Sequence, residues 1–406
     1  MTLMQFPKLP LPPPLMGGEV GSFAYFTVIE RLPAIARRSI AENNFPIPLA
    51  ENLEKLAQEI PEQPIRNLAE KEAPDLAAWA NYVKPYLGKN WLDVPWYFAE
   101  AYFYRRILEA TQYFQPGKWQ SVDPYSLQKR LGLEKAKNSI QALSTQVNKL
   151  QVKWDKKDLE YLLYLALWGN RVDLSLWPAN EGDRSSTNVE QEITRILAND
   201  APAVAEIWAN SRNLKIDFII DNAGFELFCD LCLAEFLLSS KIANLVRFHL
   251  KAHPTFVSDA MRADVDYTLK DMAANQKEEV RAIACRIQEY IHKNCLQLYE
   301  DFFWTSPLAF WEIPQQLRLL LAEANWIIIK GDANYRRLLG DRHWEFTTPF
   351  TDIVSYFPAP LVALRTLKSE LAAGLHPLKI EKVSKQDSDW LTNGKWGVIQ
   401  MLPQRT

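Results

Sequence analysis

The sequence predicts an α/β protein, a three-layer α/β/α sandwich around a mostly parallel, doubly wound sheet, with an added N-terminal all-helical domain. Two observations support this prediction. From Leu214 onward, short apolar runs typical of buried strands alternate with segments whose apolar residues recur at helical spacing. Before about residue 150 only the helical spacing occurs, and no parallel strands are indicated. With right-handed crossovers, such strands end at one common edge of the sheet.

The first part of the chain divides by composition. Prolines at 7, 10 and 12–14 indicate an extended tail over residues 1–20. The helical patterns that follow cover residues 22–43 (with a break expected at Pro33), 53–59, 76–86, 95–110, 127–150 and 159–167. We therefore predict a tail over 1–20, a helical domain over 21–150 and an α/β domain over 151–406.

The α/β part begins with the run Leu214–Ile220, which stops at Asp221-Asn222 and is followed by a helical pattern from Phe225. Later strands are predicted at 243–250, 326–330, 361–364 and 396–402, and helices at 263–274 and 279–300. Cys229 and Cys232 form a CxxC within the helical pattern that begins at Phe225, where core packing is the preferred interpretation.

Polar residues follow several of these strands. Because parallel strands point their carboxyl ends the same way, we expect one rim to collect Asp221, Asn222, Asp259, Asp332, Arg336, Arg365 and Lys368. Taken alone, Asp221 is more simply a helix cap, but the repetition of such residues after later strands favours a site.

The first three rim residues offer oxygen donors and no sulfur or imidazole, which suits a hard cation such as Mg²⁺ or Mn²⁺. Arg336, Arg365 and Lys368 are cations that could hold phosphoryl oxygens. Together they predict a metal and phosphate site. The turn at Gly169-Asn170 makes Asn170 a further candidate for substrate binding, and residues 181–189 read as a polar loop that could cover the site.

Bulk properties exclude other classes. A net charge of -3 over 406 residues gives no electrostatic case for nucleic acid or an anionic membrane. No apolar run approaches the roughly 20 residues that span a bilayer, and the N-terminus does not read as a signal peptide. We expect a cytoplasmic protein whose partner is a small phosphorylated metabolite; its oligomeric state is open. GxxxxGK[ST], DxDx[TV], GxGxxG and GxSxG motifs are missing from the sequence.

Several motifs together resemble one family, the metal-dependent damage-control phosphatases. They are LKIDFIIDNAGFELFCDL, PTFVSD, KGDANYRRLLGD and RTLK, with ALWGNRVDLSL and the early SFAY in support. The resemblance spans most of the chain, and the RTxK form of the last motif is that of the third subfamily.

The resemblance implies an α/β/α fold with an appended helical domain, and Asp221, Asn222 and Asp259 as metal ligands. Residues Asp332, Asn334, Tyr335, Arg336 and Lys368 would line the substrate site. The metal would be Mn²⁺, Co²⁺ or Ni²⁺ in preference to Mg²⁺, and the substrates sugar phosphates such as fructose 1-phosphate and fructose 6-phosphate.

Two alternatives stay open. The third subfamily includes a protein described as an acidic-residue methyltransferase, and Glu226 matches a position assigned there to S-adenosylmethionine. A carboxyl methyltransferase is therefore the second reading, with Glu226 otherwise a substrate contact. A non-catalytic metabolite-binding protein is the third.

Overall fold

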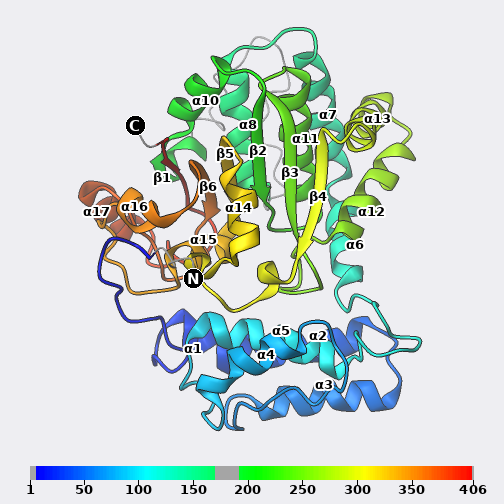
Figure 1. Cartoon of the computed structure of the whole chain (residues 1–406), viewed down its shortest axis with the longest axis vertical. Coiled ribbons are helices and arrows are strands. Elements are labelled where there is room, and N and C mark those ends of the chain that lie inside the picture. The colour runs from blue at the N-terminus through cyan, green and yellow to red at the C-terminus, as the bar shows by residue number, and fades with distance from the viewer. Residues whose placement is uncertain (1–5, 170–191, 405–406) are drawn as a thin grey trace.

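The computed structural model describes residues 6–169 and 192–404 and confirms the predicted α/β architecture, with a layer of helices beneath a sandwich (Figure 1). Asn170 and the predicted loop over 181–189 lie outside the described residues. No helix within the described ranges is long and apolar enough to cross a membrane.

A seven-stranded sheet forms the centre, in the order β1-β7-β6-β5-β2-β3-β4. All neighbouring pairs are parallel except β6 and β7. The strands are β1 (Ile196–Asn199), β2 (Leu214–Ile219), β3 (Ala243–Lys251), β4 (Leu296–Asp301), β5 (Trp326–Lys330), β6 (Leu361–Thr366) and β7 (Gly397–Leu402). Both faces of the sheet are covered, so every residue of the central strand β5 is buried.

Helices cover the two faces. Side chains alternate along β5, with Ile328 in the core of one face and Ile327 and Ile329 in that of the other. The first core includes α6 (Ser126–Lys135), α7 (Lys137–Leu150), α8 (Lys156–Trp168), α10 (Ala201–Ala209), α11 (Phe225–Ser239), α12 (Arg262–Ala273) and α13 (Glu278–His292). The second includes α14 (Gln315–Ala322), α15 (Gly331–Leu339), α16 (Phe350–Ile353) and α17 (Pro377–Gln386).

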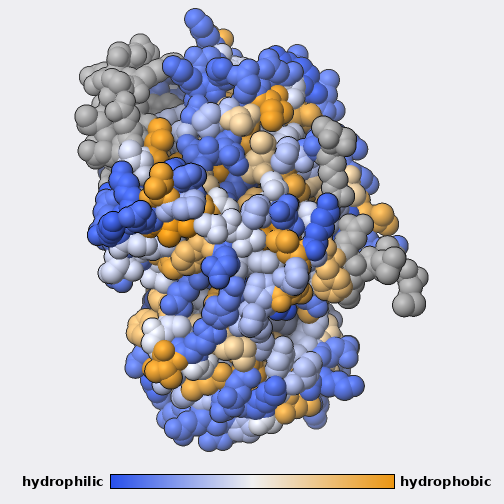
Figure 2. Space-filling view, turned by 90° about the vertical axis from the view of Figure 1, so that its left-hand side faces the viewer, coloured by the Kyte–Doolittle hydropathy of each residue, from blue (hydrophilic) through white to orange (hydrophobic). Residues whose placement is uncertain are grey.

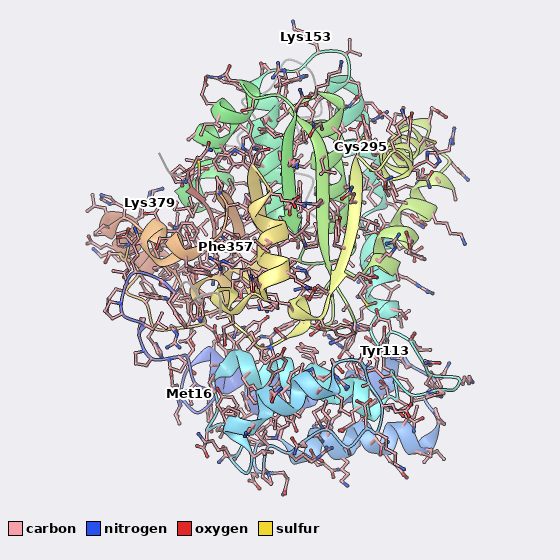
Figure 3. All side chains as sticks on the ribbon, viewed as in Figure 1. Met16, Tyr113, Lys153, Cys295, Phe357 and Lys379 are labelled. Carbon is pink, nitrogen blue, oxygen red and sulfur yellow. The ribbon has the colours of Figure 1, made fainter. Side chains whose placement is uncertain are left out.

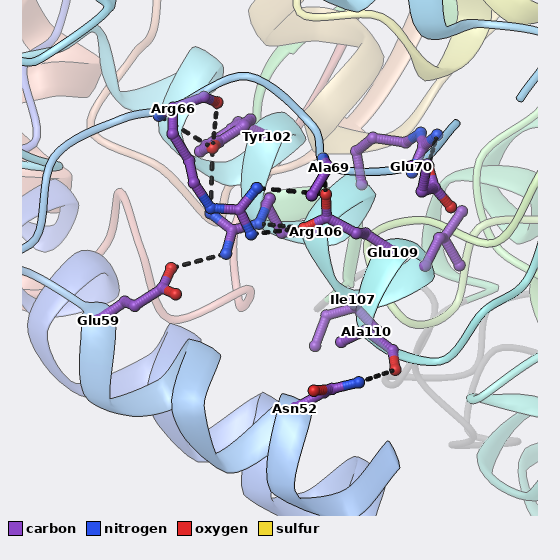
Figure 4. A network of polar contacts seen from close by, with 12 residues as sticks. Asn52, Glu59, Arg66, Ala69, Glu70, Tyr102, Arg106, Ile107, Glu109 and Ala110 are labelled. Carbon is purple, nitrogen blue, oxygen red and sulfur yellow. Dashed lines mark hydrogen bonds and ion pairs between the residues drawn. The ribbon is translucent and has the colours of Figure 1, made fainter. Parts of the chain in front are cut away.

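The helical layer consists of α1 (Phe23–Phe26), α2 (Leu32–Glu42), α3 (Ile47–Glu59), α4 (Leu76–Val83) and α5 (Trp96–Ala110). Salt bridges tie it together, as Figure 4 shows: Arg106 of α5 pairs with Glu59 of α3 at 2.6 Å and with Glu109 at 2.8 Å. Arg66 reaches the same Glu109 at 2.7 Å. Because α5 lies between the other helices and the sheet edge, nearly all of its residues are buried.

Two local expectations were wrong, and one further strand was not predicted. The helix predicted over 279–300 ends at His292; Asn294 adopts φ 57°, and β4 follows as a half-exposed edge strand whose polar sequence hid it. The short strand β1 was not foreseen. Pro33 breaks no helix, because it lies in the first turn of α2, and the irregular part is a π-helical turn just before it, Thr27–Arg31.

The packing changes earlier in the chain than residue 150, where we placed a domain boundary. Helix α7 packs against α11 and α13, and its apolar residues belong to the core of the sandwich. Among the helices that the structure describes, α1 to α5 form the layer beneath it. In the turned view of Figure 2 this layer lies below a narrowing of the molecule, and hydrophobic residues are scattered among hydrophilic ones.

Strand β4 and the loop after β3 run down toward α1 to α5 (Figure 1), so the carboxyl ends of the parallel strands face the helical layer. Side chains fill the junction, with Met16 and Tyr113 marking its two sides in Figure 3. The position of the predicted site is therefore between the sheet edge and α5.

Candidate active site

Asp221 and Asn222 follow β2 and lie beside Asp259, which follows β3. A short antiparallel bridge joins Asn222 to Asp259. Two backbone hydrogen bonds flank it, from the Ala223 amide to the Ser258 carbonyl at 2.7 Å and from the Ala260 amide to the Asp221 carbonyl at 2.8 Å. The structure thus brings the three predicted metal ligands together.

The side-chain amide of Asn222 is held from three directions. Its Nδ2 donates to Asp221 Oδ2 at 2.7 Å and to Glu226 Oε2 at 2.8 Å. Its Oδ1 accepts a hydrogen bond from Ser258 Oγ at 2.5 Å. The amide therefore has one orientation, in which its oxygen keeps one lone pair for another partner.

The absence of a side chain at Gly331 leaves room for the Asp221 carboxylate. This glycine starts α15 with φ 81°, and a Cβ added to it would lie 1.9 Å from Asp221 Oδ2. Any other residue would both strain the backbone and displace the carboxylate. The Asp221 side chain consequently lies against the first turn of α15.

Lys251, the last residue of β3, is the cation nearest Asp259, with Nζ 3.0 Å from Oδ2. The same ammonium donates to Asn334 Oδ1 at 3.3 Å. The Asn334 amide in turn donates to the carbonyls of Ile220 and Lys330, at 3.1 and 2.9 Å. Asn334 is fully buried and connects the ends of β2, β3 and β5.

Negative charge is crowded in this cluster. Burial raises the pKa of the Asp221 carboxyl well above its usual value, and the carboxylates of Glu226 and Asp259 raise it further. Burial also raises the pKa of Asp259, against the opposing charge of Lys251. A cation placed between these groups would relieve both effects.

A second buried network supports the cluster from behind. Lys330 Nζ lies 3.2 Å from Glu226 Oε1 and 2.8 Å from Asp230 Oδ1, and it also donates to the Ala166 carbonyl. Burial raises the pKa of Asp230 to about 7, although the Lys330 ammonium opposes this. Glu226 therefore bridges Asn222 and Lys330.

The cationic part of the rim is organised by Asp332. Its Oδ1 accepts hydrogen bonds from Arg365 Nε at 2.8 Å, from the Lys368 backbone amide at 3.1 Å and from Ser369 Oγ at 3.0 Å. Burial opposes ionisation of Asp332, but the charges of Arg365 and Arg336 outweigh it, so the pKa of Asp332 lies below its usual value. Lys368 is close enough to Asp221 for its charge to lower the pKa of that carboxyl.

Three residues predicted to line the substrate site make contacts within the fold. The Arg365 guanidinium also donates to the Leu371 carbonyl and to Ser369, and it stacks over the Tyr335 ring. Tyr335 donates its hydroxyl to Gln400 at 2.7 Å.

Arg336 pairs with Glu100 at 2.6 Å and Asp341 at 2.7 Å, and its guanidinium stacks over Trp96. These partners come from α5 and from the turn after α15. The structure thus turns Arg336 away from the carboxylate cluster and into the junction with the helical layer.

Sequence reasoning missed Ser258, Lys251, Lys330, Asp230 and Ser369. Ser258 adjoins Asp259. Lys251 lies one residue beyond the strand predicted at 243–250. Lys330 is the last residue of the strand predicted at 326–330, but no role in the site was assigned to it. No sequence pattern indicates that Asp230 forms an ion pair with Lys330.

Within residues 6–169 and 192–404, no group of three or more His, Cys, Asp or Glu side chains is arranged to hold a metal ion. The donor set at the sheet edge differs in kind, since it joins two carboxylates to the amide oxygen of Asn222. A cavity of about 240 Å³ adjoins it, between α6, the first turn of α11 and residues 257–258.

A protein family and several known proteins are similar to this chain over most of its length. A family model described as the damage-control phosphatase ARMT1-like domain matches residues 27–383. A protein named damage-control phosphatase ARMT1 from Xenopus tropicalis is 33% identical to this chain, over 94% of this chain and 96% of its own length. The protein of the same name from Homo sapiens is also 33% identical, over 96% of this chain and 98% of its own length. A solved structure of a DUF89 family protein from Pyrococcus horikoshii aligns over 92% of this chain and 96% of its own, with 14% identity and a TM-score of 0.47.

Proposed function

The chain belongs to the ARMT1-like damage-control phosphatases, and from this membership we propose that it is a metal-dependent phosphomonoesterase of small sugar phosphates such as fructose 1-phosphate and fructose 6-phosphate. One observation carries the proposal. A buried, carboxylate-rich cluster lies beside a lysine, Lys368, at the edge where the strands end. The carboxylates suit a cation, and the lysine suits an anion.

The residues present fit a divalent cation. Asp221, Asn222 and Asp259 would hold it through hard oxygen donors, and the space over Gly331 lets the Asp221 carboxylate take its position. Mn²⁺, Co²⁺ or Ni²⁺ is proposed, with Mg²⁺ as a further candidate. Such an ion neutralises phosphoryl charge and lowers the pKa of a bound water.

Lys368 is the residue that we propose contacts the phosphoryl group. Its backbone amide is fixed by Asp332, while Arg365 is held by Asp332, Ser369 and Leu371. An ammonium aimed at developing phosphoryl charge stabilises the transition state more than the ground state. Arg365, Asn334, Tyr335 and Arg336 act as positioning residues.

Glu226 bears on the methyltransferase alternative. It is buried, and its two oxygens are taken by Asn222 and by Lys330. A role in binding S-adenosylmethionine would add a further contact to a carboxylate whose two oxygens already have partners within the fold. We propose that Glu226 orients Asn222 and that the chain has no affinity for the methyl donor.

The experiment is a panel of phosphate esters offered to the purified protein with Mn²⁺, Co²⁺, Ni²⁺ or Mg²⁺, with phosphate release as the readout. We expect release from fructose 1-phosphate or fructose 6-phosphate. Calorimetry with S-adenosylmethionine should show no binding. Micromolar binding of the methyl donor, with no phosphate released from any sugar phosphate under any of the four metals, would overturn the proposal.

A further inference from the structure

The loop that joins β3 to Asp259 has an unfavourable backbone conformation. Phe256 and Val257 both have positive φ, 46° and 67°. The Ser258 amide donates to the Phe256 carbonyl at 2.8 Å, which closes a γ-turn around Val257. A β-branched residue rarely adopts positive φ, and such a turn persists only where the surrounding structure enforces it.

This γ-turn sets the two residues that follow it. Ser258 Oγ donates to Asn222 Oδ1 at 2.5 Å, and the Ser258 carbonyl accepts from the Ala223 amide at 2.7 Å. Asp259 comes next and pairs with Lys251. The unfavourable backbone therefore lies directly beside the carboxylate cluster.

The aromatic side chain of the turn packs against the helical layer. The Phe256 ring stacks on Tyr97 with centroids 5.5 Å apart and contacts Tyr104 at 4.8 Å. Both tyrosines are only 5% exposed. They lie seven residues apart on α5, which places them on the same face of the helix, two turns from each other.

The same face of α5 also contacts α15. Glu100 lies between the two tyrosines and pairs with Arg336 at 2.6 Å. Arg336 is one turn along from Asp332, whose carboxylate organises the cationic part of the site. One face of α5 thus contacts both segments that supply the site.

We propose that the face of α5 formed by Tyr97, Glu100 and Tyr104 is a positioning surface, which holds the γ-turn through Phe256 and thereby fixes Ser258 and Asp259 for cation binding. The proposal deepens the proposed function, because it takes Asp259 as a metal ligand. Phe256 is then a positioning residue. Without its ring, the turn relaxes toward negative φ and Asp259 loses its fixed place.

The test compares two aromatic truncations. Phe256→Ala removes the contact, and Phe98→Ala is the matched control. Phe98 is a buried α5 residue whose ring stacks on Tyr102 and packs at a tilt against Tyr86, within the helical layer. Calorimetric titration with Mn²⁺ should show affinity reduced about tenfold or more in Phe256→Ala, the usual scale for losing support around a metal ligand. Phe98→Ala should change it less than about twofold, well below that scale.

Two substitutions at Val257 test the turn itself. Val257→Gly should bind Mn²⁺ as well as the unaltered chain, because glycine adopts positive φ without strain. Val257→Pro should reproduce the loss seen in Phe256→Ala, because proline fixes φ near −65° and therefore cannot form this turn.

Hydrogen exchange measured by mass spectrometry on the peptide around Ser258 and Ala260 reports the turn without reference to metal. We expect faster exchange in Phe256→Ala and unchanged exchange in Phe98→Ala. Unchanged exchange and Mn²⁺ affinity in Phe256→Ala, or equal losses in Phe98→Ala, would overturn the proposal. If the unaltered chain binds no divalent cation, the proposal that Asp259 is a metal ligand fails. The hydrogen-exchange rates around Ser258 then decide by themselves whether α5 holds the turn.

Discussion

Asp221 and Asp332 follow neighbouring strands, β2 and β5, and lie at the same sheet edge, yet their surroundings shift their pKa values in opposite directions. Burial and two nearby carboxylates raise the pKa of Asp221. The pKa of Asp332 is lowered despite burial, because Arg365 and Arg336 supply positive charge and the Lys368 amide donates to it.

The difference separates two kinds of acidic residue that look alike in sequence. The charge of Asp332 is already compensated, so this residue is suited to orient Arg365 and Lys368. The charge of Asp221 is not, and a divalent cation is the simplest group that would compensate it. We therefore propose that the β2–β3 half of the rim binds the cation and that the β5–β6 half binds the phosphate.

The largest effect is expected on the cation half. Asp221→Ala should lower kcat/KM for the sugar phosphate by about a thousandfold or more, because a bound cation contributes several kcal/mol to transition-state stabilisation. Circular dichroism should show the fold retained. Asp266→Ala, at an exposed carboxylate, is the control. Near-normal turnover of Asp221→Ala under limiting Mn²⁺ would contradict the assignment.

The phosphate half should give a smaller but distinct effect. Lys368→Ala should reduce kcat/KM by about a hundredfold to a thousandfold, the scale for losing one electrostatic contact to the transition state. Its affinity for Mn²⁺ should stay close to normal. The exposed Lys382→Ala serves as control, and an unchanged rate in Lys368→Ala would move this lysine out of the site.

The smallest effect concerns stability. The pKa of Asp230 is about 7 in the folded protein, above its value in the unfolded chain, so the folded state holds this proton more tightly. The stability from this group is complete below about pH 4 and is lost as pH rises through 7. In the metal-free protein, Asp230→Asn should therefore reduce the fall in Tm between pH 5 and pH 8.

Asp266→Asn is the control for that measurement, because its side chain is exposed. An identical dependence of Tm on pH in Asp230→Asn and in the unaltered chain would show that Asp230 does not titrate in this range.

The sequence predicted the cluster because its members are strand-end residues. Runs such as Trp326–Lys330 are buried on both faces, and their carboxyl ends meet by the geometry of a parallel sheet. The sequence could not show that Arg336 pairs with Glu100, because the two residues are 236 positions apart. They meet only because the helical layer packs on the sandwich.

The positioning contacts were hidden for the same reason. Phe256 is one aromatic residue in a loop, and no local pattern shows that it meets Tyr97 and Tyr104. Strand β4 was missed because an edge strand exposes one side and can carry a polar sequence. Short-range periodicity therefore located the ligands but not the contacts that hold them.

The most direct test of whether the two halves of the rim bind different ions is a calorimetric Mn²⁺ titration of Asp259→Asn and Asp332→Asn. Both substitutions remove one negative charge at nearly constant shape, and the residues lie at the same sheet edge. The assignment predicts that Asp259→Asn weakens Mn²⁺ binding by about a hundredfold, while Asp332→Asn changes it by less than about threefold. Equal losses in the two variants, or a loss confined to Asp332→Asn, would contradict it.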